Sequence, residues 1–191
     1  KVGTDVTSFK DGDRVFGFFD TGLESQAEFL ITKPENLYPI PNEVDFKQAA
    51  ASLEGAHYAY TFIHKVNLKP SDRVLINGAT GGIGSALLQF VKTFDVEITA
   101  TSNSKNMDLI KRLGAHHVID YTKEDITQTS NQYNYIFDAV GKSTFGKCKP
   151  ILKEDGVYIS SELGPFAQNL VFAISTSIFG KKKVFFPVPY S

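Results

Sequence analysis

A glycine-rich turn between a short apolar run and an amphipathic run constrains this 191-residue chain more than any other feature. The segment reads Arg73-Val-Leu-Ile-Asn-Gly-Ala-Thr-Gly-Gly-Ile-Gly84. The apolar run Val74–Ile76 is typical of a parallel strand that is covered on both faces. The glycines lack Cβ atoms where the backbone must bend sharply and approach another group closely. The segment therefore predicts a buried strand, a tight turn and a helix.

The same turn predicts an anion site. Apolar residues of the following run share one helical face: Ala86, Leu87, Phe90, Val91 and Phe94. The start of such a helix combines unbonded backbone N–H groups with the positive end of the helix dipole, and a pyrophosphate is the usual occupant in this setting. Ala79 stands in place of the first glycine of the dinucleotide fingerprint. We expect the pyrophosphate to bind at Thr80, Gly81, Gly82, Ile83 and Gly84.

Strand and helix patterns alternate on both sides of this turn. Further strands are predicted at 97–102, 117–120, 135–140, 156–160 and 183–186, with helices at 106–113 and 166–179. Upstream, helices are predicted at 46–53, with Asp45 as N-cap, and at 58–66. Such alternation predicts an α/β fold, a doubly wound parallel Rossmann sheet with right-handed crossovers, over residues 41–191.

Residues 1–40 have an all-β pattern instead. An Asp11-Gly12 turn precedes the apolar Val15-Phe16, and Ala27–Ile31 is a second candidate strand. The prolines of Pro34–Pro41 predict an irregular linker. Two strands cannot bury a core by themselves, so we expect them to belong to a sheet or barrel whose other strands lie outside this sequence.

Composition excludes several classes of partner. A formal net charge of −1 provides no field that would attract nucleic acid or an anionic membrane. The apolar run Asn169–Phe179 is far shorter than the roughly 20 residues that a membrane span needs. A single cysteine, Cys148, excludes an intrachain disulfide and fits a reducing compartment, so we expect a cytoplasmic protein.

Three further segments carry a family resemblance: Val2–Gly17, Leu37–Ile40 and Ala49–Ala56. With the glycine turn, they resemble the medium-chain dehydrogenase/reductase superfamily, and its zinc-independent quinone oxidoreductase-like branch, often labelled NAD(P)-dependent alcohol dehydrogenase. The resemblance implies that residues 1–40 are the remnant of a GroES-like catalytic domain and its linker. It also implies that a segment is missing before Lys1 and a tail after Ser191, so we expect this fragment to be inactive by itself.

The residues after the second predicted strand of the Rossmann region bear on the choice of cofactor. A carboxylate about 20 residues past the glycines would bond the 2′-hydroxyl of NAD. This chain has no carboxylate there before Asp108, and instead has Ser102, Ser104 and Lys105. Hydroxyls and an ammonium suit a 2′-phosphate, which predicts NADP(H), although the same residues could merely cap the next helix. The resemblance adds Tyr121 to this phosphate site; the alternative is a half-buried aromatic at a strand end.

Cofactors of open α/β sheets lie beyond the carboxyl ends of the strands. Val140 and Gly141 follow the fourth predicted strand there, and Ser160 and Ser161 hold the matching place on the fifth. The resemblance puts ribose and nicotinamide along these edges, although Gly141 could simply start a helix. Asp138 is interpreted as a structural carboxylate. His57 and Tyr58 could polarise a substrate carbonyl or could pack as ordinary helix residues; the catalytic residues stay unknown.

No metal site is expected. Zinc-dependent relatives in this superfamily use cysteine and histidine ligands and a four-cysteine lobe, whereas the matching segment between Gly17 and Ala27 has no cysteine. Glu54 stands at the place of the last catalytic ligand. His116 and His117 are adjacent on a strand and so face opposite ways. Lys147 and Lys149 could lower the pKa of Cys148, but we expect a lone, inert thiol.

These observations predict an NADP(H)-dependent oxidoreductase that delivers hydride to a quinone or an α,β-unsaturated carbonyl without metal. A zinc-free alcohol or aldehyde dehydrogenase is the alternative enzyme, and a non-catalytic dinucleotide-binding redox sensor is the alternative from another class. Lys183–Pro187 should form an edge strand, with unpaired backbone groups along one side. The edge and the resemblance together predict a homodimer through this strand.

Overall fold

The computed structural model describes residues 1–18 and 27–187. The chain divides into two compact units between Glu54 and Gly55, a boundary that lies within a helix, whereas the sequence suggested a boundary between residues 40 and 41.

The first unit contains one antiparallel strand pair. Strand β1 (Val15–Phe16) pairs with β2 (Tyr38–Pro39), and a 3₁₀ turn, η1 (Pro34–Asn36), precedes β2. The predicted linker is therefore partly regular, because Pro34 suits the first position of a helical turn and Pro39 lies in a short strand that needs few donors. Ala27–Ile31 forms no strand, and Phe29 and Ile31 are 88% and 98% exposed. Residues 27–31 pair with no other strand of the described chain, and extended backbone without a partner is not a strand.

Helix α1 (Phe46–His64) is one continuous helix where two were predicted. Asp45 caps it as expected: Gln48 N donates to Asp45 Oδ1 at 2.7 Å, and Asp45 N donates to Gln48 Oε1 at 3.0 Å. Gly55 lies inside the helix, where a Cβ would come within 2.6 Å of Gly82 O. Gly55, which lies between the two predicted helices, is therefore needed for close packing against the glycine turn.

The second unit is built on six parallel strands in the order β5-β4-β3-β6-β7-β8. This is the doubly wound arrangement, in which the chain starts in the middle of the sheet and winds outward both ways. The strands are β3 (Arg73–Asn77), β4 (Glu97–Ser102), β5 (His117–Asp120), β6 (Tyr133–Asp138), β7 (Leu152–Ser160) and β8 (Lys183–Phe185). The helices are α2 (Gly82–Val91), α3 (Met107–Leu113), α4 (Phe145–Cys148) and α5 (Gln168–Phe179), with 3₁₀ turns η2 (Ser104–Asn106), η3 (Ile126–Gln128), η4 (Lys149–Ile151) and η5 (Pro165–Ala167).

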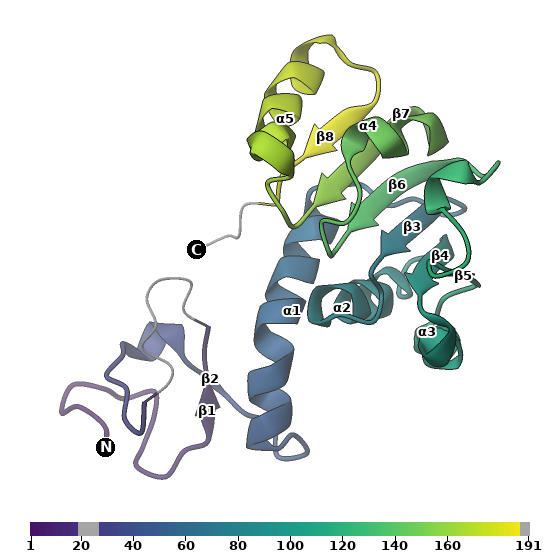
Figure 1. Cartoon of the computed structure of the whole chain (residues 1–191). Coiled ribbons are helices and arrows are strands. Elements are labelled where there is room, and N and C mark those ends of the chain that lie inside the picture. The colour runs from purple at the N-terminus through teal and green to yellow at the C-terminus, as the bar shows by residue number, and fades with distance from the viewer. Residues whose placement is uncertain (19–26, 188–191) are drawn as a thin grey trace. The chain divides into compact units, whose positions relative to one another are not determined.

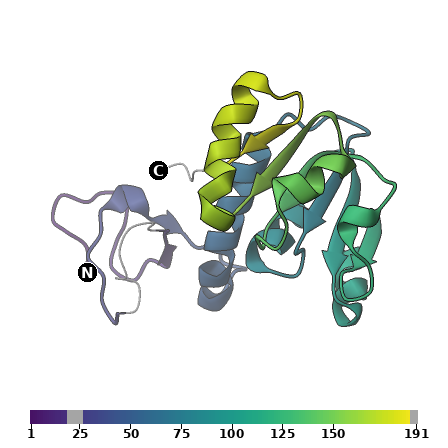
Figure 2. The same cartoon turned by 45° about the horizontal axis from the view of Figure 1, so that its top comes forward.

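Two apolar cores cover the two faces of this sheet. Successive residues of a strand point to opposite faces, so Val74 and Ile76 join one core and Leu75 the other. Helices α2 and α3 lie over the first face, together with Phe62 of α1, and α4 and α5 lie over the second (Figure 1, Figure 2). The three-layer arrangement confirms the predicted α/β class.

Several predicted boundaries differ from the structure, and two of these differences have local reasons. Strand β6 ends at Asp138 instead of Val140, because the Asp138 carboxylate accepts the N–H groups of Val140 and Ser143 and turns the chain. Helix α5 starts at Gln168 instead of Phe166, because Phe166 and Ala167 have φ values of 54° and 55°, outside the right-handed helical region.

Candidate functional site

The glycine turn has the geometry of an anion cradle. Gly81 is the N-cap of α2, so the N–H groups of Gly82, Ile83 and Gly84 have no acceptor within the helix. A Cβ on Gly84 would lie 2.1 Å from Gly78 O, which makes a side chain there impossible without moving the backbone. A Cβ on Gly82 would meet nothing within 4 Å. Gly84 is therefore required by packing, whereas the space above Gly82 is open to a ligand.

Two glycines that support the cradle carry no signal in the fingerprint. Gly55 of α1 lets that helix pass close to Gly82. Gly78 has a φ of 85°, and a Cβ there would come within 2.3 Å of Val140. Gly78 follows strand β3 directly, so its position at a strand end was the available clue; Gly55 could be identified only in three dimensions.

A cavity of about 710 Å³ opens at the carboxyl edge of the sheet. Its walls come from the ends of β3 and β4 and from the segments that follow β3, β5 and β6. Three of the predicted cofactor residues line it: Thr80, Tyr121 and Val140. The other lining residues are Asn77, Gly78, Thr101, Lys123–Thr127, Lys142, Ser143 and Lys147.

A chain of hydrogen bonds across four strands starts from two residues that line this cavity, Thr101 and Asn77. Thr101 Oγ1 donates to Asn77 Oδ1 at 2.8 Å, and Asn77 Nδ2 donates to Asp138 Oδ1 at 3.0 Å. Tyr158 OH donates to Asp138 Oδ2 at 2.9 Å, and burial beside this carboxylate raises the pKa of Tyr158 well above its usual value. Asp138 has no exposed surface, so it is the structural carboxylate that the sequence suggested.

The Val140–Gly141 turn and the end of β7 lie next to each other. Gly141 has a φ of 61°, and a Cβ there would come within 2.3 Å of the Glu162 side chain. Ser160 Oγ accepts from Glu162 N at 3.2 Å, and Ser161 N donates to Asp138 O at 3.1 Å. These contacts bring Gly141, Ser160 and Ser161 to one edge, although Ser160 is 1% exposed and therefore shapes the edge without offering a ligand surface.

The three residues expected at a 2′-phosphate differ in their availability. Ser102 has no exposed surface, and its hydroxyl donates to Asn103 O at 2.8 Å, so it braces the turn instead of facing a ligand. Ser104 and Lys105 are exposed. Asn103 is the residue that caps η2, since its side chain accepts from Asn106 N at 3.1 Å. The capping alternative therefore does not apply to Ser104.

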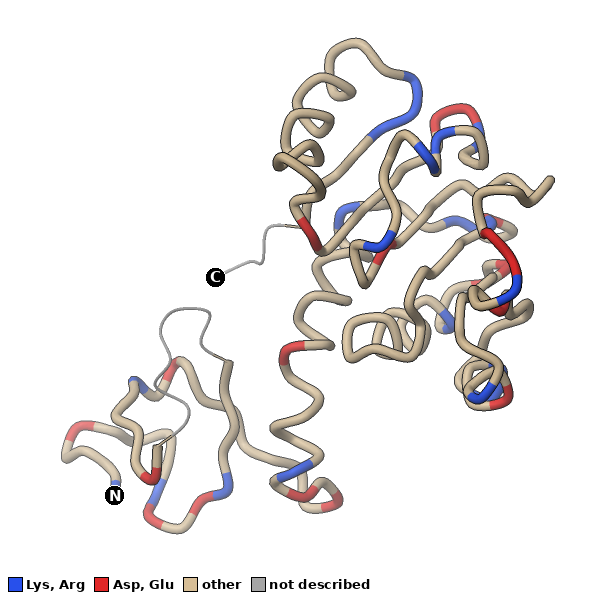
Figure 3. The backbone as a smooth tube through the Cα atoms, in the orientation of Figure 1, with Lys and Arg blue, Asp and Glu red and all other residues tan. Residues whose placement is uncertain are grey.

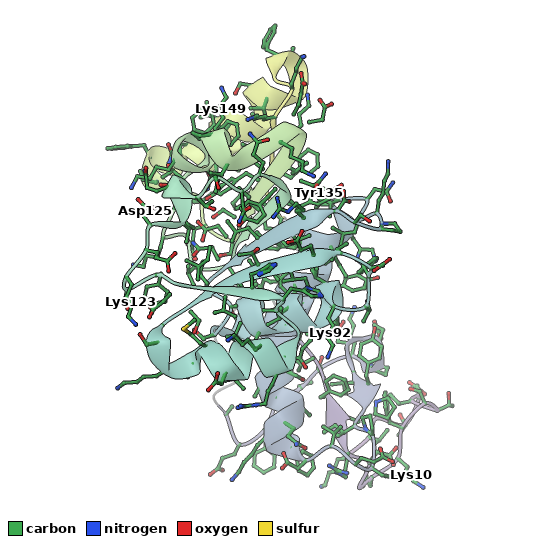
Figure 4. All side chains as sticks on the ribbon, turned by 90° about the vertical axis from the view of Figure 1, so that its right-hand side faces the viewer. Lys10, Lys92, Lys123, Asp125, Tyr135 and Lys149 are labelled. Atoms are coloured by element: carbon green, nitrogen blue, oxygen red, sulfur yellow. The ribbon has the colours of Figure 1, made fainter. Side chains whose placement is uncertain are left out.

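One charged residue beside Ser102, Ser104 and Lys105 was not identified from the sequence. Asp120 ends β5, and its carboxylate accepts the hydroxyls of Ser104 and Thr122. These hydrogen bonds, that of Ser104 first, lower the pKa of Asp120 to about 2, so it is ionised at neutral pH. The loop that follows carries Lys123 and Asp125, whose side chains lie on the same side of the molecule (Figure 4). A carboxylate on the strand beside the fingerprint position gives no signal in a sequence pattern.

The remaining candidates do not form a reactive centre. Burial raises the pKa of Cys148 to about 11 and outweighs the lowering by Lys147, which agrees with the expected inert thiol. Within residues 1–18 and 27–187, no three His, Cys, Asp or Glu side chains come together as a metal site. Most of the segment matching the four-cysteine lobe lies outside the described residues. His57 and Tyr58 are partly buried on α1 and do not line the cavity. None of the helices in the described part of the chain has the length and hydropathy to cross a membrane.

Comparison with known proteins finds a family. Residues 82–187 match the family model described as zinc-binding dehydrogenase. The chain is 32% identical to the quinone-oxidoreductase homolog of spinach chloroplasts, over 96% of this chain and 59% of that protein. It is 30% identical to the NADPH-dependent alkenal/one oxidoreductase of Arabidopsis thaliana chloroplasts, over 84% of this chain and 43% of that protein. The chain thus spans about half the length of these relatives.

A solved structure shows the same architecture over almost the whole chain. The quinone oxidoreductase of Pseudomonas syringae superposes with a TM-score of 0.79 at 28% identity, covering 98% of this chain and 60% of that one. The fold of this chain is therefore a known one.

Proposed function

The chain belongs to the zinc-binding dehydrogenase family, in the quinone oxidoreductase-like branch of the medium-chain dehydrogenase/reductase superfamily, and on that premise we propose that it is the cofactor-binding part of an NADP(H)-dependent oxidoreductase. The enzyme would transfer hydride to a quinone or an α,β-unsaturated carbonyl. The observation that carries the proposal is the glycine turn, with open space above Gly82 beside the cavity of about 710 Å³.

The residues of the chain fit a dinucleotide in a definite way. The N–H groups of Gly82, Ile83 and Gly84 would bind the pyrophosphate at the N-terminus of α2. Thr80, Tyr121 and Val140 would contact the cofactor in the cavity, and Gly141 would let the chain approach the ribose and nicotinamide. When bound, the nicotinamide would supply the hydride, and the protein's task is to fix its distance and angle to the acceptor.

The preference for the phosphorylated cofactor rests on exposed basic charge. Lys105 lies in η2, in the turn after β4 where the adenosine ribose of a bound dinucleotide is expected. Its ammonium would pair with a 2′-phosphate and gain nothing from a 2′-hydroxyl. The name of the Arabidopsis relative, an NADPH-dependent alkenal/one oxidoreductase, supports the same preference.

Chemistry without metal is part of the proposal, although the family's description refers to zinc. Glu54, at the place of the last catalytic ligand, is an exposed residue of α1. A single oxygen ligand does not make a zinc site. We also propose a cytoplasmic homodimer that contacts neither nucleic acid nor membrane, with β8 at the dimer interface.

Steady-state oxidation of NADPH by the full-length protein, with a panel of quinones and α,β-unsaturated carbonyls, tests the proposal. Turnover with at least one of these acceptors, unchanged after dialysis against a chelator, is the expected result. Turnover only with alcohols or aldehydes would favour the zinc-free alcohol dehydrogenase instead. Tight NADPH binding without turnover of any acceptor would contradict the enzyme and favour a redox sensor.

A further inference from the structure

The end of strand β4 lacks the carboxylate that would select NAD, but the neighbouring strand brings one to the same place. Strands β4 and β5 pair in parallel with Ser102 opposite Asp120, so both residues lie at the carboxyl edge of the sheet. A ribose at this edge is expected to lie against the turn that follows β4. Asp120 therefore belongs to the corner that decides between a 2′-hydroxyl and a 2′-phosphate.

The carboxylate of Asp120 is held in a fixed set of contacts. Its Oδ1 accepts Thr122 N at 3.0 Å and Thr122 Oγ1 at 2.6 Å. Its Oδ2 accepts the hydroxyl of Ser104 and lies 3.6 Å from Lys123 Nζ. Asp120 itself is 4% exposed, whereas Ser104 is exposed. Any effect of Asp120 on a ligand is therefore transmitted largely through Ser104 and Lys123.

The direction of the Ser104 hydrogen bond has a chemical consequence. A serine hydroxyl has a single proton, and an ionised carboxylate can only accept, so Ser104 gives its proton to Asp120. The surface that Ser104 leaves for a ligand then consists of oxygen lone pairs. Lone pairs accept a bond from a ribose 2′-hydroxyl, but they repel the oxygens of a 2′-phosphate.

We propose that Asp120 is a specificity-determining residue that restrains the preference for the phosphorylated cofactor. It acts by turning Ser104 into an acceptor and by keeping a buried negative charge, with the Lys123 ammonium drawn to it, beside the 2′ position. Lys105 then favours NADPH while Asp120 and Ser104 keep NADH usable, so the chain binds both cofactors. The inference rests on the proposed function, because it assigns a role within the same cofactor site.

The variant Asp120→Asn reverses the hydrogen bond and keeps the shape. The amide oxygen can still accept from Thr122, while the amide nitrogen, in the place of Oδ2, would donate to Ser104 Oγ. The Ser104 proton would then point outward as a donor, and Lys123 would be free to turn to the phosphate. Calorimetric titration should show the NADPH-to-NADH affinity ratio rising about tenfold over the parent, with NADH binding unchanged or weaker.

Ser104→Ala and the double variant test the route of the effect. In the parent background, Ser104→Ala should weaken NADH at least as much as NADPH, because only NADH uses its lone pairs. In the Ser104→Ala background, Asp120→Asn should change the ratio by less than half as much, on a logarithmic scale, as it does in the parent. Asp108→Asn, which removes an exposed carboxylate of the same segment without touching Ser104, should leave the ratio within about twofold.

The outcomes separate this inference from the function on which it rests. A ratio that is unchanged in folded Asp120→Asn would overturn the inference alone, as would a loss of NADPH binding specific to Ser104→Ala. A parent chain that binds neither dinucleotide would overturn the proposed function and the inference with it. Circular dichroism of each variant establishes that it is folded.

Discussion

At the scale of single residues, two glycines of one turn lack a side chain for different reasons. A side chain on Gly84 would overlap the backbone of Gly78 and Ala79, so the fold excludes it. A side chain on Gly82 would overlap nothing in the protein, so the fold tolerates it. In the fingerprint that begins at Ala79, Gly84 is a glycine position and Gly82 is not, and only the structure shows that the space above Gly82 is left open for a ligand.

Lys105 gives the first prediction at this scale. NADPH should bind at least about tenfold more tightly than NADH, which corresponds to about 1.4 kcal/mol. Because Lys105 is exposed at the end of β4, Lys105→Ala should remove most of that difference and leave NADH affinity nearly unchanged. Calorimetry with both cofactors measures it, and a parent chain that prefers NADH would contradict the assignment.

Cys148 gives the second. It has no exposed surface, and burial raises its pKa to about 11, so almost no thiolate is present at pH 8. A disulfide reagent should therefore react with the native protein at least about a hundredfold more slowly than with the urea-unfolded chain. The rate of colour release at pH 8 measures this. Comparable rates in the two states would show that the thiol is accessible.

At the scale of elements, the sequence predicts regular structure well where the pattern is local. The predicted bounds of β4 and β5 agree with the structure residue for residue, because each strand is a short segment rich in β-branched residues. Prediction from the sequence fails where contacts between distant parts of the chain determine the local structure. The close approach that explains a glycine inside α1 is to Gly82, and the carboxylate that ends β6 is held by Asn77 and Tyr158 from neighbouring strands.

The same contrast between local patterns and distant contacts applies to the candidate site. The residues of the glycine turn were predictable because they are contiguous in the sequence. The burial of Ser102 and the bond from Ser104 to Asp120 were not, because β4 and β5 meet only in the folded sheet.

A comparison of two helical glycines tests the account of α1. Gly55→Ala would place its Cβ 2.6 Å from Gly82 O, and overpacking of this kind typically costs about 1–3 kcal/mol. Gly146→Ala in α4 is the matched control, since its Cβ would meet only Thr144 Oγ1 at 4.0 Å and alanine favours a helix by up to about 1 kcal/mol. Urea unfolding should show opposite signs for the two. Equal stabilisation by both would mean that the close approach of α1 to the glycine turn is wrong.

At the scale of the whole molecule, helix α5 presents an apolar surface next to the edge strand β8. Strand β8 is the last strand of the sheet, as the sequence predicted. Its edge is less open than expected, because Val184 N donates to Thr176 Oγ1 of α5 at 2.9 Å. Helix α5 carries no charged residue (Figure 3), and Val171, Ile174 and Ile178 are 62%, 68% and 66% exposed on one face. An apolar helix face next to a sheet edge is a surface that a second copy could cover.

If the proposed homodimer forms through β8 and α5, a charge placed on the exposed face of α5 should disrupt it. Ile174→Glu would bury a charge in the interface, so light scattering should show the full-length dimer shifting to monomer at micromolar concentration. Leu109→Glu, on α3 at the other face of the sheet and 42% exposed, should leave the dimer intact. A full-length parent that is monomeric at that concentration would rule out the interface.

The proposed function depends most on the binding of a dinucleotide over the glycine turn. Calorimetric titration of NADPH into the parent chain and into Gly82→Val tests this directly, since the added isopropyl group would fill only space that the protein leaves open. We predict saturable one-to-one binding by the parent and, in a variant whose unfolding curve matches the parent's, no detectable heat of binding. Equal affinity for NADPH in the two proteins would show that the ligand does not lie over Gly82 and would contradict the assignment of the site.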